Sequence, residues 1–480
     1  MSLNIIQRNI ARRTKIVCTI GPSTSSPVVM KELLDAGMDV ARINFSHGTR
    51  TEHAANIKNV RKAATELGLP LAIIQDLPGQ KNRTGKLAKG TVELKENSHF
   101  TITTRDVLGD KHHVSVDSPE LPKKIKPGDA IFLNDGVIRL KVIDTSDTDI
   151  DCQVIVGGQL GENKGINTPG INWGTPAITD EDWEHLDFGI KQKVDFVALS
   201  FITSAEDILK VRKVLNQKGL TTALIAKIER REALDNLDGI LEAADGIMVA
   251  RGDLGVEIPI QRVPIVQKEI IHKCNHLGKP VIVATQMLES MINTPTPTRP
   301  EATDIANAIF DGADALMLSG ETAVGHYPRE AVSIMSQIIL ETEAALPYEE
   351  ILTNKGKDLQ PQTDDAISYA ACHTAQQLGA VAIIAFTSSG STAKRVAKYR
   401  PKVPILAITS NKITQRQLSL SWGVHAFHVP DASRITELFA QGARVAKGTS
   451  LARDGDLIVI TGGVPLGISG STNLLKVEEV

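Results

Sequence analysis

The sequence predicts an α/β protein built on a (β/α)8 TIM barrel, with an inserted all-β domain and a C-terminal α/β domain that contains an open sheet. Three observations predict this fold class. Eight short apolar runs precede residue 325, one connection between them is far longer than the rest, and a second series of strand-like and helix-like segments follows residue 346. The 480-residue chain is long enough for two or three domains.

The eight apolar runs are rich in Val, Ile, Leu and Ala and do not alternate with polar residues, which is typical of strands buried on both faces. They are Lys15–Ile20, Asp39–Asn44, Leu71–Asp76, Val194–Ser200, Ala223–Ile228, Gly246–Ala250, Pro280–Thr285 and Ala315–Leu318. Helical patterns fill most of the stretches between them, over Pro27–Ala36, Thr51–Leu67, Ala205–Lys218, Pro264–Leu277 and Glu301–Phe310. A doubly wound open sheet is the alternative to the barrel, because the number of strands does not show that a sheet closes.

The connection after the third run, residues 81–175, is too long for an ordinary loop between a strand and a helix. Alternating strand-like pieces separated by Gly, Pro, Asp and Asn indicate an inserted all-β domain. These pieces are Thr101–Thr104, Ala130–Leu133, Val137–Val142 and Gln153–Val156. We therefore expect an N-terminal arm (1–13), a barrel in two parts (14–80 and 176–346), this inserted domain and a C-terminal domain (347–480).

The C-terminal region begins with a stretch of loose composition, Thr353–Thr363, which we expect to be a linker. The strands expected beyond it are Val381–Phe386, Pro404–Ile408, Val424–Val429 and Leu457–Thr461. The helices expected between them are Asp365–Leu378, Thr392–Lys398 and Arg434–Lys447. Four or five strands are too few for a barrel, so an open sheet is predicted.

Composition limits the possible partners and the cellular location. Hydrophobic residues make up 42% of the chain and charged residues 23%, as in soluble globular proteins, and the net charge of -3 predicts no binding to nucleic acid or to an anionic membrane. The four cysteines are scattered without metal-ligand spacing, which favours reduced, structural thiols. Because Met1–Thr14 lacks the apolar core of a secretory signal and no apolar run approaches the ~20 residues of a membrane span, we expect a cytoplasmic protein.

The C-terminal ends of the predicted barrel strands carry polar and ionisable residues. These ends are Arg42–His47, Asp76, Ser200, Lys227–Glu229, Arg251–Asp253, Thr285–Gln286 and Ser319–Glu321. Active sites of such barrels lie at this end, so the pattern predicts one shared polar site. The alternative, that each polar residue caps the following helix, suits one or two strands better than all of them.

The residue types at these ends point to phosphoryl transfer. Glu229 and Asp253 supply hard carboxylate oxygens that suit Mg²⁺, with Mn²⁺ as a second candidate. Lys227 lies two positions before Glu229 on one strand, so both side chains point the same way, and a lysine there can stabilise charge on a phosphoryl group or an enolate. Arg42 and Arg83 offer planar guanidinium groups for phosphate oxygens. A plain ion pair at a strand end is the alternative for Lys227 and Glu229.

Several long segments of the chain resemble the pyruvate kinase family. They are Thr14–Pro22 (TKIVCTIGP), Gly37–Gly48 (GMDVARINFSHG), Lys227–Glu229, Ala244–Glu257 (ADGIMVARGDLGVE), Gly278–Met291 (GKPVIVATQMLESM) and Asp311–Thr322 (DGADALMLSGET). The resemblance covers nearly the whole chain and implies the same three-part fold. It also implies transfer of the phosphoryl group of phosphoenolpyruvate to ADP in the last step of glycolysis, allosteric regulation and a homotetramer.

The resemblance implies a role for each matching residue of the reaction site. Lys227 is similar to the family's charge-stabilising lysine, and Thr285 to the residue on the route that protonates the enolate. Arg42 resembles the contact to the substrate phosphate, and the backbone of Gly252 resembles a further substrate contact. Ser319, at the end of the eighth strand, joins Lys227, Thr285, Arg42 and Arg83 as a catalytic candidate.

The resemblance also implies binding sites for metal ions and for the nucleotide. Glu229 and Asp253 resemble the Mg²⁺ ligands, and Asp253 counts with the substrate contacts as well. The residues that resemble the family's monovalent-cation site are Asn44, Ser46 and Asp76, through their side chains, and Leu77, through its carbonyl group. The candidate contacts to the phosphates of ADP or ATP are Asn44, His47, Arg83 and Lys164, the last reaching in from the inserted domain as a lid that excludes water.

The run after the third strand departs from the family pattern. Gln80 and Asn82 replace Pro and Ile of the family, which predicts a softer lid hinge, and Thr203 stands where an Arg is common. Lys81 resembles the members that need no K⁺, because a tethered ammonium can replace the charge of a bound K⁺. Leu77 also resembles the members that need no K⁺, whereas Thr84 resembles the members that depend on K⁺. We hypothesise K⁺ independence, with a plain solvated lysine as the alternative.

A second candidate site lies in the C-terminal region. The predicted strand that ends at Phe386 runs into a hydroxyl-rich turn and then a helix, an arrangement that can hold a phosphate. The turn consists of Thr387, Ser388, Ser389, Gly390, Ser391 and Thr392. The family resemblance implies an effector site here for a phosphorylated metabolite, closed by a loop like Thr461–Thr472. A simple Ser/Thr helix cap is the alternative.

Two other functions compete with this interpretation. A Mg²⁺-dependent aldolase would share the barrel, but it would not need the inserted domain with Lys164. A catalytically inactive sensor would retain only the effector domain, and it would predict losses among the charged residues at the strand ends, which are intact. Dependence of pyruvate formation on ADP separates the first alternative from a kinase.

Overall fold

Eight parallel strands form a closed barrel in the computed structural model, which describes residues 10–80, 82–171, 176–465 and 471–480. The strand order around the barrel is β1-β16-β15-β14-β13-β12-β3-β2. The strands are β1 (Lys15–Ile20), β2 (Val40–Asn44), β3 (Ala72–Asp76), β12 (Phe196–Leu199), β13 (Ala223–Ile228), β14 (Gly246–Ala250), β15 (Val281–Ala284) and β16 (Ala315–Leu318). Closure confirms the predicted barrel and excludes the open sheet.

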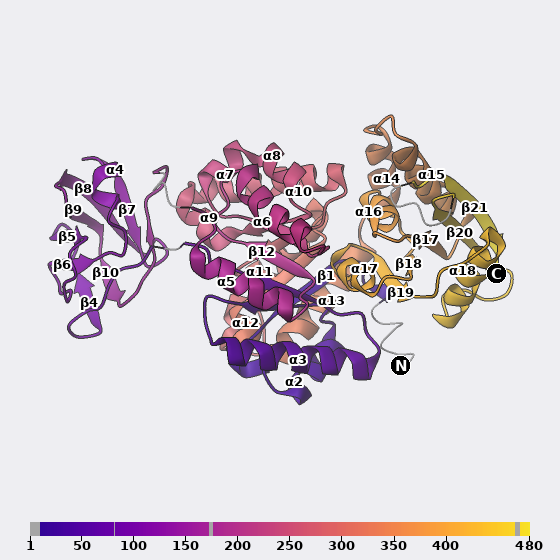
Figure 1. Cartoon of the computed structure of the whole chain (residues 1–480), viewed down its shortest axis with the longest axis horizontal. Helices are drawn as coiled ribbons and strands as arrows, with labels where there is room; N and C mark the ends of the chain where they lie inside the picture. Colours follow the sequence, from indigo (N-terminus) through magenta and orange to yellow (C-terminus); the bar gives the residue numbers. More distant parts are fainter. Residues whose placement is uncertain (1–9, 81, 172–175, 466–470) are drawn as a thin grey trace.

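Helices surround the barrel, as Figure 1 shows. They are α2 (Pro27–Ala36), α3 (Arg50–Leu67), α5 (Asp180–Lys191), α6 (Ala205–Gln217), α7 (Arg231–Asp235), α8 (Leu237–Ala243), α9 (Arg251–Glu257), α10 (Val263–Leu277), α11 (Arg299–Asp311), α12 (Gly320–Ala323) and α13 (Pro328–Ala344). Short 3₁₀ turns are η1 (Pro22–Thr24), η2 (Ile260–Arg262) and η3 (Glu289–Ile292). The five helices predicted in this region are all present, whereas α5, α7, α8, α9, α12 and α13 were not among them.

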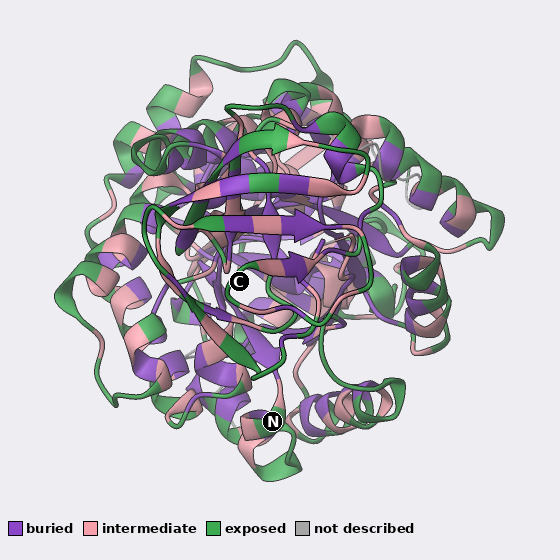
Figure 2. Ribbon diagram, turned by 90° about the vertical axis from the view of Figure 1, so that its left-hand side faces the viewer, coloured by how far each residue is buried: buried purple, intermediate pink, exposed green. Residues whose placement is uncertain are grey.

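The inserted segment is an all-β unit at one end of the molecule (Figure 1). Its elements are β4 (Thr91–Leu94), β5 (His99–Thr103), β6 (His113–Ser115), α4 (Leu121–Lys124), β7 (Ala130–Leu133), β8 (Ile138–Thr145), β9 (Asp149–Val156), β10 (Gly158–Gly161) and β11 (Ile166–Asn167). They form a six-stranded sheet, β11-β7-β8-β9-β5-β6, and a two-stranded sheet, β10-β4. In Figure 2 its strands alternate between buried and exposed residues, the pattern of a sheet with one solvated face.

The C-terminal sheet has the order β19-β18-β17-β20-β21. Its elements are α14 (Tyr348–Gly356), α15 (Thr363–Leu378), β17 (Ala382–Phe386), α16 (Ser391–Lys398), β18 (Ile405–Thr409), α17 (Lys412–Gln417), η4 (Leu418–Leu420), β19 (Val424–His428), α18 (Ile435–Gly448), β20 (Leu457–Gly462) and β21 (Leu474–Glu479). The first four strands are parallel to their neighbours, and β21 is an antiparallel edge strand that the sequence did not predict.

The expected linker is partly helical, which corrects the prediction for its first residues. Helix α14 continues to Gly356 and so includes the start of the stretch that was expected to be loose. Glu349 and Glu350 lie in the first turn, where negative charge stabilises the helix dipole, and Leu352 is buried against the C-terminal core. Packing of one apolar side chain thus outweighs the weak local composition.

The C-terminal sheet unit covers the N-terminal end of the barrel, opposite the inserted unit (Figure 1). Leu420 is fully buried in the cluster of side chains that fills the barrel interior. Arg400 forms a buried ion pair with Asp314 (2.8 Å), and Arg416 pairs with Asp195 (2.7 Å), each aspartate lying just before a barrel strand. The C-terminal ends of the strands are therefore the open end that faces the inserted unit. In the part of the chain described, no helix is long and apolar enough to cross a membrane.

Candidate active site

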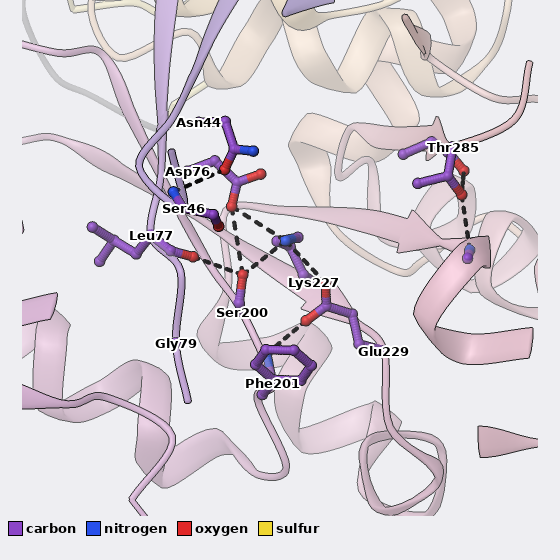
Figure 3. Close-up of polar contacts among 12 residues, drawn as sticks. Asn44, Ser46, Asp76, Leu77, Gly79, Ser200, Phe201, Lys227, Glu229 and Thr285 are labelled. Atoms are coloured by element: carbon purple, nitrogen blue, oxygen red, sulfur yellow. Dashed lines mark hydrogen bonds and ion pairs between the residues drawn. The ribbon is translucent and has the colours of Figure 1, made fainter. Parts of the chain in front are cut away.

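An ammonium group surrounded by oxygens lies at the open end of the barrel (Figure 3). Lys227 Nζ donates to Ser200 Oγ at 2.7 Å and forms ion pairs with Glu229 Oε1 at 2.9 Å and Asp76 Oδ1 at 3.2 Å. Lys227 lies on β13, Glu229 follows this strand, Asp76 ends β3 and Ser200 follows β12. Three adjacent strands therefore bring their polar ends to one point, as the sequence pattern predicted.

Asp76 links this lysine to an arginine on the neighbouring strand. Arg42 Nε donates to Asp76 Oδ2 at 2.7 Å, and its Nη1 donates to Thr19 Oγ1 at 3.0 Å. Arg42 and Asp76 are both buried, so these contacts compensate for the loss of water around the charges. The arrangement fixes two cationic groups on opposite oxygens of one carboxylate.

Burial and charge act together on the ionisation of these groups. Burial acts to lower the pKa of Lys227, but attraction to Asp76 and Glu229 outweighs it and raises the pKa, so the amine stays charged. Burial opposes the ionisation of Asp76, yet Lys227 and Arg42 bring its pKa below the usual value. Burial raises the pKa of Glu229; attraction to Lys227 opposes this shift without cancelling it, and the negative charge of Asp253 adds to it.

The negative charges of Glu229 and Asp253 repel each other, which makes it less favourable for Glu229 to be ionised. Asp253 lies in α9, just after β14, and its charge acts on both Lys227 and Glu229. Glu229 Oε2 also accepts the backbone N–H of Phe201 at 2.7 Å, which fixes its orientation. A divalent cation between these carboxylates would relieve the repulsion, and hard oxygen ligands are the kind that Mg²⁺ prefers. The residues present thus fit a Mg²⁺ ion.

Three non-glycine residues beside the site adopt left-handed backbone conformations. Phe201 has φ 53°, Thr285 φ 70° and Gln286 φ 56°. Such conformations are unfavourable for side chains with a Cβ and concentrate at functional sites, because the surrounding structure must impose them. Here they occur immediately after β12 and β15, where the strands turn away from the barrel.

Thr285 belongs to a second group of contacts, to one side of Lys227 in Figure 3. Its Oγ1 accepts the N–H of Gly252 at 2.8 Å and donates to the carbonyl oxygen of Ala284 at 2.6 Å. Arg251 holds this turn in place, because its Nη2 donates to the Thr285 carbonyl at 2.7 Å while its Nη1 pairs with Asp304 at 2.6 Å. The hydroxyl of Thr285 is thereby attached to the start of α9, the helix that carries Asp253.

Comparison with known proteins identifies the family to which this site belongs. The profile of the pyruvate kinase barrel domain matches residues 11–332, and that of the pyruvate kinase alpha/beta domain matches residues 365–478. The chain belongs to the pyruvate kinase family. It is therefore a phosphotransferase, as the resemblance of its motifs predicted.

Relatives and a solved structure agree over the full length of this family member. The chain is 49% identical over 472 residues to the pyruvate kinase of Geobacillus stearothermophilus, which covers 98% of this chain and 80% of that protein. It is 45% identical over 471 residues to the pyruvate kinase of Clostridium acetobutylicum, with 98% and 100% covered. A crystal structure of a pyruvate kinase from Cryptosporidium parvum is 36% identical, with a TM-score of 0.93 over 99% of this chain and 97% of that one.

The residues predicted for the monovalent-cation site of a pyruvate kinase lie together at the ends of β2 and β3 (Figure 3). Asn44 Oδ1 accepts the backbone N–H of Ser46 at 3.2 Å, and the carbonyl of Leu77 accepts Ser200 Oγ at 2.7 Å. Asp76 is shared with this site, although both of its oxygens also face cationic side chains. Lys81, on which the hypothesis of K⁺ independence depends, lies outside the described residues.

Of the predicted nucleotide contacts, Asn44 lies beside Asp76 at the end of β2, whereas Arg83, Lys164 and His47 are not bonded to the lysine cluster in the described part of the chain. Arg83 Nη1 donates to the carbonyl of Asn163 at 3.1 Å, beside Lys164 on the return segment of the inserted domain. His47 is exposed on the loop after β2. Within the described ranges, no hydrogen bond or ion pair joins Arg83, Lys164 or His47 to Lys227.

Ser319 follows β16, as predicted, but its hydroxyl is placed unusually. Its Oγ is buried and makes no hydrogen bond to any residue that the structure describes. The backbone N–H of Ser319 donates to Glu321 Oε2 at 2.7 Å, and burial raises the pKa of this glutamate. The catalytic role predicted for Ser319 stays a prediction.

Sequence reasoning gave no role to three residues that the geometry makes important. Ser200 was noted only as the end of the fourth strand, yet it connects Lys227 to the Leu77 carbonyl. Thr19 and Arg251 act by orienting Arg42 and Thr285, respectively. The position of Ser200 at a strand end could have marked it as a site residue. Thr19 lies inside a strand, so the sequence contained no comparable signal for it.

The hydroxyl-rich turn in the C-terminal unit lines a cavity of about 400 Å³. Thr387, Ser388, Ser391 and Thr392 contribute to its wall. Thr392 Oγ1 and Thr472 Oγ1 share a buried hydrogen bond of 2.8 Å, so the turn and the facing loop meet as predicted.

Gly390 and Ser389 form hydrogen bonds within the turn. Gly390, at φ 89°, donates its N–H to Thr387 Oγ1 at 2.9 Å and closes the turn, while Ser389 Oγ donates to Ser391 Oγ at 3.2 Å. The described residues of the cavity wall include no Lys, Arg or His, and Asp431 is their one charged member. Hydroxyl groups thus supply most of the polar side chains of the described wall.

Proposed function

We propose that the chain catalyses Mg²⁺-dependent transfer of the phosphoryl group of phosphoenolpyruvate to ADP, which yields pyruvate and ATP. The observation that carries this proposal is the ammonium of Lys227, held between Asp76, Glu229 and Ser200 at three adjacent strand ends. A cation fixed in this way at the open end of a barrel suits a reaction whose transition state carries spread negative charge.

Each described residue has a defined task in this reaction. The bond between phosphorus and the enol oxygen of phosphoenolpyruvate breaks, and a bond forms from phosphorus to a terminal oxygen of ADP. Lys227 stabilises the charge on the phosphoryl group and then on the enolate oxygen, and Arg42 binds the substrate phosphate. Thr285 lies on the route by which a proton reaches the enolate carbon, which gives pyruvate.

Glu229 and Asp253 would hold the Mg²⁺ ion, and Gly252 at the start of α9 would contact the substrate through its backbone. When bound, the divalent ion supplies positive charge that neutralises substrate oxygens. Arg83 and Lys164 would contact the phosphates of the nucleotide, with Asn44 and His47 beside them. Because Arg83 and Lys164 lie on the inserted unit, whereas Asn44 and His47 lie at and after the end of β2, approach of this unit to the barrel would bring them together and exclude water.

A coupled assay for pyruvate tests this function. We expect pyruvate formation that requires phosphoenolpyruvate, ADP and Mg²⁺ together and stops when EDTA removes the metal ion. Pyruvate formation that does not depend on ADP would favour the aldolase alternative. No activity with any nucleoside diphosphate, from a folded protein, would favour the inactive sensor.

We propose that the enzyme works without added K⁺, because Lys81 can supply the positive charge of the monovalent cation. Support comes from the sequence, in which Lys81 follows Leu77, and from the site around Asp76, where two cationic side chains already face the carboxylate. The assay is run in the chloride of a bulky organic cation with and without K⁺. A many-fold rise in activity on adding K⁺ would contradict this proposal.

We further propose that the C-terminal cavity binds a phosphorylated metabolite that regulates the enzyme. The polar wall of hydroxyl groups, at the N-terminus of α16, supports binding of a phosphate. Replacement of Ser388, Ser389 and Thr392 together by Ala should abolish any response to a panel of sugar phosphates and nucleotides, while activity without effector is retained. An unchanged response in this triple variant would place the effector elsewhere.

The expected assembly, domain limits and location stay proposals. A homotetramer is inferred from the family, and light scattering on the purified chain measures it. The proposed boundaries near residues 81, 175 and 347 predict preferred sites of limited proteolysis. A cytoplasmic location is tested by fractionation of the source cells.

A further inference from the structure

The two connections of the inserted unit are paired with each other. The backbone N–H of Thr84 donates to the carbonyl of Lys164 at 2.8 Å, and the N–H of Ile166 donates to the carbonyl of Asn82 at 2.9 Å. We call the paired segments, which run from Asn82 to Thr84 and from Lys164 to Asn167, the hinge ribbon. Any approach of the inserted unit to the barrel must bend this ribbon or rotate it as a whole.

A small polar cavity lies between the hinge ribbon and the top of the barrel. Its wall contains Asn82 and Asn167 from the ribbon and Glu232 and Glu257 from helices α7 and α9. The space open to the centre of a water-sized sphere is only about 20 Å³. That is room for one small particle, since a single water needs roughly 10–15 Å³ on this measure.

Three oxygen atoms in this wall are buried and lack a hydrogen-bond partner among the described residues. They are Asn82 Oδ1, Asn167 Oδ1 and Glu232 Oε2. Asn82 is only 4% exposed and Asn167 only 8% exposed, so bulk water does not reach these amide oxygens. The amide of Asn167 is correctly oriented, because its Nδ2 donates to Glu257 Oε1 at 3.2 Å. Buried oxygen atoms that accept no hydrogen bond from the protein indicate that a bound water or ion contacts them.

A single water molecule is a poor match for these oxygens. Water has two hydrogens to donate, whereas the wall presents three acceptors without a partner in addition to the carboxylate of Glu257. A cation has no such limit and can contact all of the oxygens at once. Amide and carboxylate oxygens together are the hard ligands that bind alkali and alkaline-earth ions.

The charges around the cavity favour a monovalent ion. Among the described residues of the cavity wall, Glu232 and Glu257 supply two negative charges, and the guanidinium of Arg230, stacked over the ring of Phe201 at 5.3 Å, supplies one positive charge. One further positive charge balances the group, and the limited space leaves no room for the water shell that Mg²⁺ usually keeps. Burial raises the pKa of Glu257, which agrees with a carboxylate whose charge is incompletely compensated.

We propose that this cavity binds one alkali-metal cation, which ties the hinge ribbon of the inserted unit to helices α7 and α9 of the barrel. The site is separate from the predicted cation site at Asn44 and Asp76, and it does not depend on the proposed reaction. Occupancy would hold the ribbon against the barrel and so influence how the inserted unit moves over the active site.

Crystals of the full chain grown in Rb⁺, a K⁺ analogue with strong anomalous scattering, test the proposal directly. We expect an anomalous peak between Asn82 Oδ1, Asn167 Oδ1 and Glu232 Oε2 in the wild type. The peak should disappear in Glu232→Gln and remain in Glu242→Gln, which removes the same charge from an exposed position of the neighbouring helix α8. A cavity that contains only water, without anomalous signal, would overturn the proposal.

Thermal unfolding in solution provides an independent measurement. The midpoint for the wild type should rise saturably, on the order of 2 °C, when K⁺ replaces a bulky organic cation at constant ionic strength. This rise should be reduced in Glu232→Gln and in Asn167→Ala but not in Glu242→Gln. If Glu232→Gln fails to fold, Asn167→Ala decides the question. Equal rises in all four proteins would show that the K⁺ effect arises elsewhere and would contradict the proposal.

Discussion

At the scale of single residues, the site depends on one lysine whose charge several carboxylates share. Lys227 compensates Asp76 and Glu229, which are each only 1% exposed. Removing one partner from such a buried group leaves charges without compensation and is far more costly than loss of a surface ion pair. The same residue therefore affects both catalysis and stability.

We predict that Lys227→Met lowers kcat by about 10³-fold or more, because it removes charge stabilisation of the transition state. It should also destabilise the fold by roughly 3 kcal/mol, since Asp76 and Glu229 lose their shared cation. The coupled assay and urea unfolding measure the two effects. Lys218→Met, which breaks a surface pair with Asp187, is the control and should change neither much. Full turnover in Lys227→Met would disprove the assigned role.

A second lysine, far from the active site, predicts a dependence of stability on pH. Burial, followed by the nearby charge of Arg400, lowers the pKa of Lys355 to about 7. Between pH 7 and the unfolded value of 10.5 the unfolded chain binds more protons than the folded one, so this group makes stability rise with pH across that window. Urea unfolding from pH 7 to 10 should show this rise in the wild type.

The contribution of Lys355 is isolated by replacing it. In Lys355→Met the rise should be smaller, so the free energy of unfolding of the wild type minus that of the variant should increase from pH 7 to 10. Lys357→Met, at an exposed position two residues later, should retain the behaviour of the wild type. Parallel pH profiles for wild type and Lys355→Met would show that Lys355 is not responsible.

At the scale of secondary-structure elements, local sequence determined much of the architecture. The predicted barrel strands end within two residues of the observed ones, because unbroken apolar runs mark strands buried on both faces. Strand β21 was missed because its residues Leu474–Glu479 are only partly buried, and its identity depends on pairing with β20. Strand β11 was missed because it has only two residues, Ile166–Asn167, and is defined by its pairing with β7.

The helix that follows β2 provides a test at this scale. Thr49 Oγ1 accepts the N–H of Glu52 at 3.3 Å, while Glu52 Oε2 accepts the N–H of Thr49 at 2.7 Å, so the two residues cap α3 reciprocally. Thr49→Ala should lower the free energy of unfolding by about 1 kcal/mol. Thr51→Ala, an exposed residue in the first turn of the same helix, serves as the control in urea unfolding. Equal effects of both changes would mean that the cap contributes nothing specific.

At the scale of the whole molecule, the site arises from the order in which the strands pair around the barrel. Side chains two positions apart on a strand point to the same side, so the sequence alone predicted that Lys227 and Glu229 point the same way. The contact of Asp76 with Lys227 was not visible in the sequence, because it depends on the pairing of β3 with β12, two strands that the long insertion separates along the chain. Local patterns thus predicted which residues are polar at strand ends, while tertiary pairing decides which of them meet.

The contact between the barrel and the C-terminal unit also belongs to this scale. Leu420 is completely buried and extends the packing of the barrel interior at the end opposite Lys227. Leu420→Ala should cost roughly 2–5 kcal/mol of stability by leaving a cavity, with little change in kcat under conditions where the protein is folded. Leu209→Ala, at a site that is 51% exposed, is the matched control. A large loss of kcat in a stably folded Leu420→Ala would indicate coupling between the two ends of the barrel.

The pairing of the connections at Asn82 and Ile166 has a consequence for protein engineering. The inserted unit enters and leaves the barrel through adjacent backbone positions, so its removal leaves two chain ends that a tight turn can rejoin. Excision should therefore produce a minimal scaffold in which the strand order is undisturbed. Conversely, unrelated domains whose termini lie close together are suitable grafts at this position.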